Sequence, residues 1–190
     1  MEAKIKYIGK RISYQEDAEK LSIIILGKEE GNRPMQRLLW LFAWLIIGSF
    51  ILNELNTLGP EDELRVVLFV FMGFWSYYLF RVLRALYWQS KGRESILVKK
   101  DEVLMKEAFG TLGKAFTLQT SNLGAMQVRE KETGFFSLFD DSFWSIGKGE
   151  LQFQIDGRIY YFGKRLSESD RNSLMRLFNQ KLKSFQHVNA

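Results

Sequence analysis

Two long stretches of the chain are apolar around their whole circumference and carry no charge. They cover residues 38–53 and 66–80 and are rich in Leu, Phe, Trp and Ile. A helix packed on a soluble core keeps a polar stripe on one side, and neither stretch has one. With their flanks the stretches reach about 35–57 and 64–88, which meets the roughly 20 residues that a membrane span requires. The pattern therefore predicts a transmembrane helical hairpin at 34–90.

The segment that joins the two predicted spans, 53–65, favours a short turn. Asn56, Gly59 and Pro60 are residues typical of turns, and the charges around them are mostly acidic. Basic residues instead gather on the outer flanks of the hairpin: Lys28, Arg33, Arg37, Arg81, Arg84, Lys91 and Arg93. Because basic flanks stay in the cytoplasm, we expect cytoplasmic N- and C-termini and an external loop.

Small and aromatic residues occupy particular places within the predicted spans. Gly48 and Gly73 fall near the middle of each span, where small residues let two helices approach closely, although isolated glycines can also carry no such meaning. Trp40 and Trp44 lie near the start of the first span, and Tyr87 and Trp88 lie past the uncharged stretch of the second. Tryptophans at such places are candidates for anchors at the membrane interface.

Short runs of β-forming residues flank the hairpin on both sides. Before it, 5–8 and 21–26 favour strands, and the residues between them are expected to form a loop that contains Gln15. After it, further strands are predicted at 95–100, 102–107, 115–120, 125–129, 150–155 and 158–162. An isolated two-stranded hairpin is marginally stable in water, so we expect the strands of 1–33 to join the sheet of 91–190.

The clearest local signals lie near the C-terminus. Asp156 and Gly157 separate two β runs, and this pair favours a type I′ turn because both of its positions take positive φ. Ser167, followed three residues later by Asp170, is typical of a helix N-cap. Apolar residues at helical spacing then extend this helix over 167–185, with an apolar face that we expect to pack on the sheet.

Composition and charge exclude several kinds of catalytic, metal and nucleic-acid-binding site. The 190 residues contain no cysteine, which excludes thiol chemistry and disulfides, and one histidine, His187. A Ser-His-Asp triad or a multi-histidine metal site is therefore not expected. The net charge of +5 is largely a topological signal, and the basic residues outside the predicted spans are interleaved with acidic ones, which argues against nucleic-acid binding. We expect no catalytic residues, no metal, no cofactor and no small-molecule substrate.

The order of these elements resembles that of bacterial membrane-anchored pleckstrin-homology-like (PH-like) proteins. The resemblance rests on 21–28 (LSIIILGK), 109–114 (FGTLGK) and 162–168 (FGKRLSE), and it covers nearly the whole chain. It implies a transmembrane helical hairpin in the bacterial cytoplasmic (inner) membrane. It also implies a mainly β cytoplasmic domain, an antiparallel sheet or partial barrel that the C-terminal helix closes. No catalysis is implied.

Six basic residues are candidates for contact with an anionic lipid head group: Arg81, Arg84, Lys99, Lys100, Lys164 and Arg165. The last two precede a helix N-terminus, where backbone N–H groups favour anions, although a solvated turn would equally explain them. The first two lie at the predicted inner interface, where their role in topology is a sufficient explanation. Lys148, between two glycines, lacks the frame of a phosphate loop and is expected to be part of a turn.

A cluster of aromatic residues precedes the predicted strand at 150–155. Its members Phe135, Phe136 and Phe139 are candidates for contact with a partner if they are exposed, and for core positions if they are buried. The favoured hypothesis is a non-catalytic, membrane-anchored binding or scaffolding protein that presents its PH-like module to a protein partner or membrane complex, or that forms a homo-oligomer. The alternative is a membrane regulator that binds anionic lipid.

Overall fold

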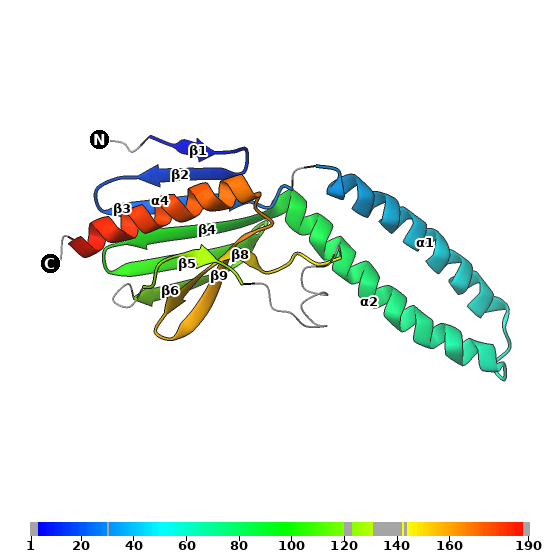
Figure 1. The fold of residues 1–190 in the computed structure, drawn as a ribbon. Helices are drawn as coiled ribbons and strands as arrows, with labels where there is room; N and C mark the ends of the chain where they lie inside the picture. Colours follow the sequence, from blue (N-terminus) through cyan, green and yellow to red (C-terminus); the bar gives the residue numbers. More distant parts are fainter. Residues whose placement is uncertain (1–3, 30, 120–122, 131–141, 143, 188–190) are drawn as a thin grey trace.

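A helical hairpin leaves one end of a β-domain in this chain (Figure 1). The computed structural model describes residues 4–29, 31–119, 123–130, 142 and 144–187. Both chain termini lie on the β-domain, and the helical hairpin projects away from it (Figure 1). We call the end of the β-domain from which the helices leave the hairpin end, and the opposite end the distal end.

The hairpin consists of α1 (Arg33–Thr57) and α2 (Glu63–Lys91). Their 25 and 29 residues, at 1.5 Å per residue, give lengths of about 37 and 43 Å, more than the roughly 30 Å of a hydrocarbon core. Only 11% and 6% of their most apolar windows are buried. The predicted pair of long apolar helices is confirmed, and both helices are long and apolar enough to cross a membrane.

A pair of tryptophans joins the two helices. The Nε1 of Trp44 donates to the carbonyl of Trp75 (3.2 Å), and the Nε1 of Trp75 donates to the carbonyl of Trp44 (2.9 Å). Gly48 lies under the Trp75 ring, since a Cβ at this position would come within 2.3 Å of that ring. At Gly73 a Cβ would meet open space. Gly48 therefore permits the close approach of the helices, whereas Gly73 does not contribute to it.

Six strands form one antiparallel sheet in sequence order. They are β1 (Lys6–Ile8), β2 (Ile12–Glu16), β3 (Lys20–Leu26), β4 (Gly92–Lys99), β5 (Glu102–Phe109) and β6 (Leu112–Gln119). β3 pairs along its whole length with β4, although the entire helical hairpin separates them in sequence. The expected loop around Gln15 is wrong, because β2 occupies this segment. Its polar residues are tolerated there because backbone pairing with β1 and β3 holds the strand.

A smaller sheet and the C-terminal helix complete the β-domain. β7 (Gln127–Val128), β8 (Gly149–Ile155) and β9 (Arg158–Lys164) form the sheet, and α4 (Glu168–His187) follows. The predicted hairpin turn is confirmed, with φ of 48° at Asp156 and 77° at Gly157. The predicted cap is confirmed too, since the Asp170 N–H donates to the Ser167 hydroxyl oxygen at 3.1 Å.

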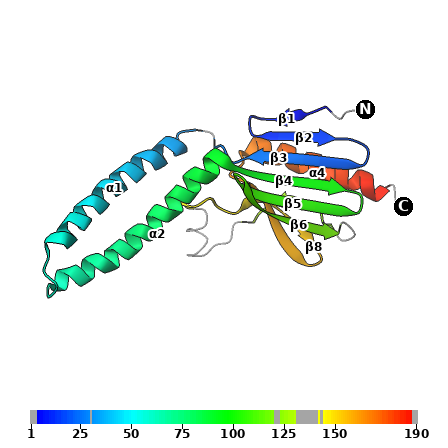
Figure 2. The ribbon, with the colours of Figure 1, turned by 180° about the vertical axis from the view of Figure 1, so that it is seen from behind.

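The core lies between the six-stranded sheet on one side and α4 with the small sheet on the other. Leu21, Ile23 and Ile25 of β3 point inward and are fully buried, whereas Ile24 points outward. They meet Leu174 and Phe178 of α4 in one cluster. α4 crosses one face of the sheet, and none of the described helices lies on the opposite face (Figures 1 and 2). The predicted antiparallel sheet with a C-terminal helix is thus confirmed.

Candidate functional site

A cleft lined by basic residues lies at the hairpin end, where α2 meets the β-domain. It encloses about 220 Å³ between the last turns of α2, the segment 144–148 and the end of β9. Its basic residues are Arg81, Arg84, Lys148 and Lys164, and none of the described residues that line it is acidic. We call it the basic cleft.

The helix α2 carries two of these residues to the cleft because one of its faces docks on the β-domain. Val82, Ala85 and Trp88 recur every third residue on this face and are buried. The Trp88 ring meets the Phe109 ring of β5 edge to face, with centroids 4.6 Å apart. Docking of this face leaves the neighbouring face, with Arg81 and Arg84, to line the basic cleft.

Aromatic side chains position these two guanidinium groups. Arg81 donates to the Tyr77 hydroxyl at 3.0 Å and also lies over its ring. The Arg84 guanidinium lies 5.4 Å from the centroid of the Phe109 ring. Neither of these contacts with an aromatic side chain involves a carboxylate.

Lys164 is the most constrained cation of the basic cleft. Its ammonium donates to a carboxylate oxygen of Glu107 and lies 4.6 Å from the centroid of the Trp88 ring. Its backbone N–H donates to Glu94, as does that of Gly163, at 2.8 and 3.0 Å. Glu94 is only 4% exposed, and this burial raises its pKa, while nearby Lys164 and the backbone N–H bonds oppose the rise.

A buried ion cluster stands behind the basic cleft and joins three separate parts of the chain. Arg37 of α1, which is 1% exposed, donates to both carboxylate oxygens of Glu29, at 3.0 and 3.1 Å. Arg165 lies 3.3 Å from the same carboxylate. Arg165 also donates to the carbonyls of Ser142 and Ser145, each at 2.7 Å. It therefore holds the segment that forms one wall of the cleft and does not line the cleft itself.

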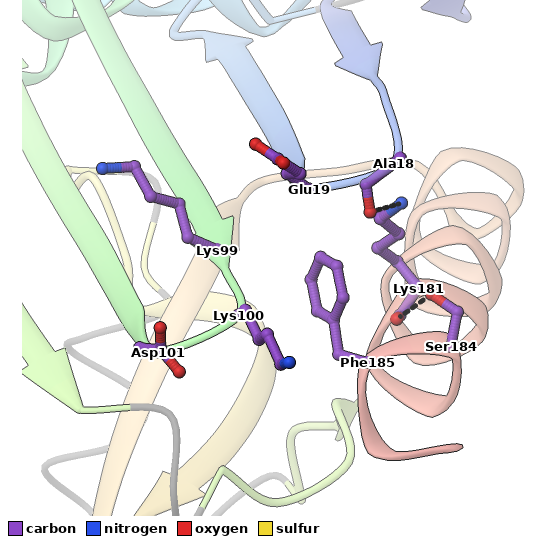
Figure 3. A pocket seen from close by; sticks show the side chains of 8 residues that line it. All are labelled: Ala18, Glu19, Lys99, Lys100, Asp101, Lys181, Ser184 and Phe185. Carbon is purple, nitrogen blue, oxygen red and sulfur yellow. Dashed lines mark hydrogen bonds between the residues drawn. The ribbon is translucent and has the colours of Figure 1, made fainter. Parts of the chain in front are cut away.

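The remaining two of the six predicted basic residues lie at the distal end: Lys99 is the last residue of β4, and Lys100 lies in the turn that leads to β5. They line a separate cavity of about 690 Å³ (Figure 3), which we call the distal cavity. The structure therefore brings Arg81, Arg84 and Lys164 together. It places Arg165 behind them and the other two in a different site.

Sequence reasoning missed Lys148 and Trp144 as parts of the basic cleft. Lys148 reaches it because β8 begins one residue later and aligns with the end of β9, as in the pairing of Gly149 with Lys164. No local signal in the sequence announces such a position, because it depends on the register of the two strands. The candidates Phe135, Phe136 and Phe139 lie outside the described residues.

Comparison with known proteins adds no assignment. The sequence matches no family model and no curated protein, and no solved structure matches. Across the part of the chain that the structure describes, no group of three or more His, Cys, Asp or Glu side chains could hold a metal ion. What the basic cleft can do chemically is attract and orient an anion by charge and hydrogen bonding.

Proposed function

We propose that this chain is a non-catalytic integral membrane protein that binds the phosphate-bearing head group of an anionic lipid in the basic cleft. In this proposal α1 and α2 cross the bacterial cytoplasmic (inner) membrane, both termini are cytoplasmic, and the β-domain is a PH-like module. The observation that carries the proposal is the meeting of four basic side chains, from three separate segments, at the end of an apolar helix.

Position and size both support a head group as the ligand. Arg81 and Arg84 lie in the last three turns of α2, where a helix of about 43 Å extends beyond the hydrocarbon core into the head-group region. A volume of about 220 Å³ is below that of cavities that enclose a drug-sized ligand. It suits a phosphate group whose acyl chains stay in the bilayer.

The test measures which lipids the protein retains. The full chain is reconstituted in nanodiscs of phosphatidylcholine with a minor share of phosphatidylglycerol, and the retained lipids are identified by native mass spectrometry after ejection. Wild type should retain phosphatidylglycerol selectively. Arg84→Gln should lower that retention roughly tenfold, because a hydrogen bond to a charged group contributes about 1.5–3 kcal/mol.

Lys91→Gln is the matched control, because Lys91 is an exposed basic residue of the same helix that does not line the cleft. It should retain phosphatidylglycerol as wild type does. Equal retention of both lipids by wild type, or equal losses in the two variants, would contradict the proposal.

A second candidate function is the presentation of the β-domain to a protein partner or to a second copy of the chain. β6 pairs with β5 alone among the described strands, so its outer backbone edge is open to another strand. Leu112 and Phe116 on this strand are 77% and 51% exposed. A photo-crosslinking residue at Phe116 should capture the partner in cells, and Ala115→Pro should abolish capture because proline removes a backbone donor.

A further inference from the structure

We infer that the distal cavity binds a soluble amphipathic monoanion, a molecule with one acidic group on a flat apolar body, of the aryl carboxylate class. The cavity lies between the turn at 18–19, the turn at 99–101 and the last turns of α4 (Figure 3). Its volume of about 690 Å³ is within the range of small-molecule sites. The inference does not use the proposed lipid site, but the solubility of the ligand rests on the proposed crossing of the membrane by the hairpin.

The distal cavity lies too far from the hairpin end to hold the head group of a lipid whose acyl chains remain in the membrane. β3 and β4 connect the two ends of the β-domain over seven and eight residues, or about 23–26 Å at 3.3 Å per residue. The head-group region on each side of a bilayer is only roughly 5–8 Å thick. With the hairpin in the membrane, the distal cavity faces the aqueous phase, and its ligand must be soluble.

One wall of the cavity is held in place by a buried ammonium. Lys181 of α4 is buried, and its Nζ donates to the carbonyl of Asp17 and, at 3.4 Å, to that of Ala18. The Asp17 carboxylate in turn accepts from the N–H groups of Glu19 and Lys20, at 3.0 and 2.8 Å. These bonds tie the β2–β3 turn to α4, so the cavity is formed before a ligand arrives.

The cavity offers an aromatic surface and a cation side by side. The Phe185 ring, 7% exposed, belongs to the hydrophobic core and also lines the cavity. Figure 3 shows Lys100 reaching toward Phe185, whereas Lys99 points away. Lys99 pairs with Glu102, while Lys100 is exposed and makes no ion pair with another described residue. The Lys181 ammonium lies 4.9 Å from the centroid of the Phe185 ring, so an apolar ring can pack only against the part of Phe185 that lines the cavity, while its acidic group meets the Lys100 ammonium.

Two acidic residues on the rim restrict the charge of the ligand. Glu19 and Asp101 line the same cavity and are both exposed. A second negative charge on the ligand would meet these carboxylates, and like charges at close range repel. The site therefore favours a monoanion over a dianion, unlike the basic cleft, whose described lining residues include no acid.

The test uses the full chain in nanodiscs of phosphatidylcholine, with 4-(trifluoromethyl)benzoate as the probe and ¹⁹F line broadening as the readout, corrected for empty nanodiscs. Wild type should bind the probe saturably. It should bind two analogues more weakly: the neutral amide of the probe and the dianion 5-(trifluoromethyl)isophthalate. Lys100→Glu should weaken binding about tenfold, as expected for the loss of a charged hydrogen bond. Ser184→Trp should weaken it as much by filling the cavity from an exposed position.

Two controls decide the outcome. Lys106→Glu makes the same charge change at an exposed lysine of β5 outside the cavity and should bind the probe as wild type does. Arg84→Gln, which alters the basic cleft, should also leave probe binding unchanged and so separates this site from the proposed lipid site. No saturable binding by wild type, or equal weakening by Lys100→Glu and Lys106→Glu in variants whose circular dichroism is native, would overturn the inference.

Discussion

The two ends of the β-domain hold their charged residues in different ways. At the hairpin end the cleft is lined by four basic residues, one of which, Lys164, is paired with Glu107, and the ion pair of Arg37 with Glu29 is buried behind the cleft. At the distal end basic and acidic residues alternate around a larger cavity, and the pair of Lys99 with Glu102 is exposed. Buried pairs at the hairpin end fix the junction with the helices, whereas exposed pairs at the distal end contribute little to stability.

The largest expected effect tests this contrast directly. Glu29→Ala removes the carboxylate that Arg37 meets with two hydrogen bonds and that Arg165 also faces. Because an uncompensated buried charge remains, the free energy of unfolding should fall by about 3–5 kcal/mol. Urea denaturation of the full chain in detergent micelles, followed by tryptophan fluorescence, measures the change.

Glu102→Ala is the matched change at the distal end, since Glu102 and Lys99 form an exposed pair. Its cost should stay within about 1 kcal/mol. Similar losses in the two variants would show that the ion cluster at the hairpin end does not fix the junction.

Sequence reasoning succeeded where the signal is local and failed where contacts are distant. The apolar helices, the Asp156-Gly157 turn and the Ser167 cap each depend on a few neighbouring residues, and the structure contains all three. The strand β2 was missed, because pairing with β3 holds Gln15 and Glu16 in the strand despite their polar character.

The candidate sites show the same division. From the sequence, Arg37 was interpreted as a charge that sets the topology and Arg165 as a candidate lipid contact. In the structure both form ion pairs with Glu29. The convergence of Lys148 with Arg84 depends on strand register and helix docking, which no short window of sequence encodes.

A smaller effect on stability is expected from the loss of the buried Lys181 ammonium in the wall of the distal cavity. Lys181→Met keeps an unbranched apolar side chain but removes the ammonium, which donates to the carbonyls of Asp17 and Ala18 and lies 4.9 Å from the centroid of the Phe185 ring. Loss of these charge-assisted hydrogen bonds should lower the free energy of unfolding by about 2 kcal/mol. Lys183→Met changes an exposed position of the same helix and should lower the free energy of unfolding by a few tenths of a kcal/mol at most. Equal midpoints of the two variants in thermal denaturation would refute a structural role for Lys181.

The smallest expected effect concerns how stability depends on pH, which should have opposite signs for a carboxylate at each end, Glu94 and Asp17. Burial raises the pKa of Glu94 at the hairpin end above its ordinary value of 4.5, against the opposing effect of Lys164. Its contribution to stability is therefore complete below pH 4.5 and is lost as the pH rises through the raised pKa. At the distal end, partial burial of Asp17 tends to raise its pKa, but hydrogen bonds from Lys20 and Glu19 outweigh this and hold it below 3.8.

The contribution of Asp17 consequently has the opposite sign, because it is present above pH 3.8 and is lost as the pH falls through the lowered pKa. Urea midpoints measured from pH 3 to 8 should show Glu94→Gln removing a decline above pH 4.5, and Asp17→Asn removing a decline in acid. A glutamine amide oxygen can still accept from the Gly163 and Lys164 N–H groups, so Glu94→Gln changes the titration and keeps the backbone contacts. If both variants altered the same part of the pH profile, the two ends would not differ in how they hold their carboxylates.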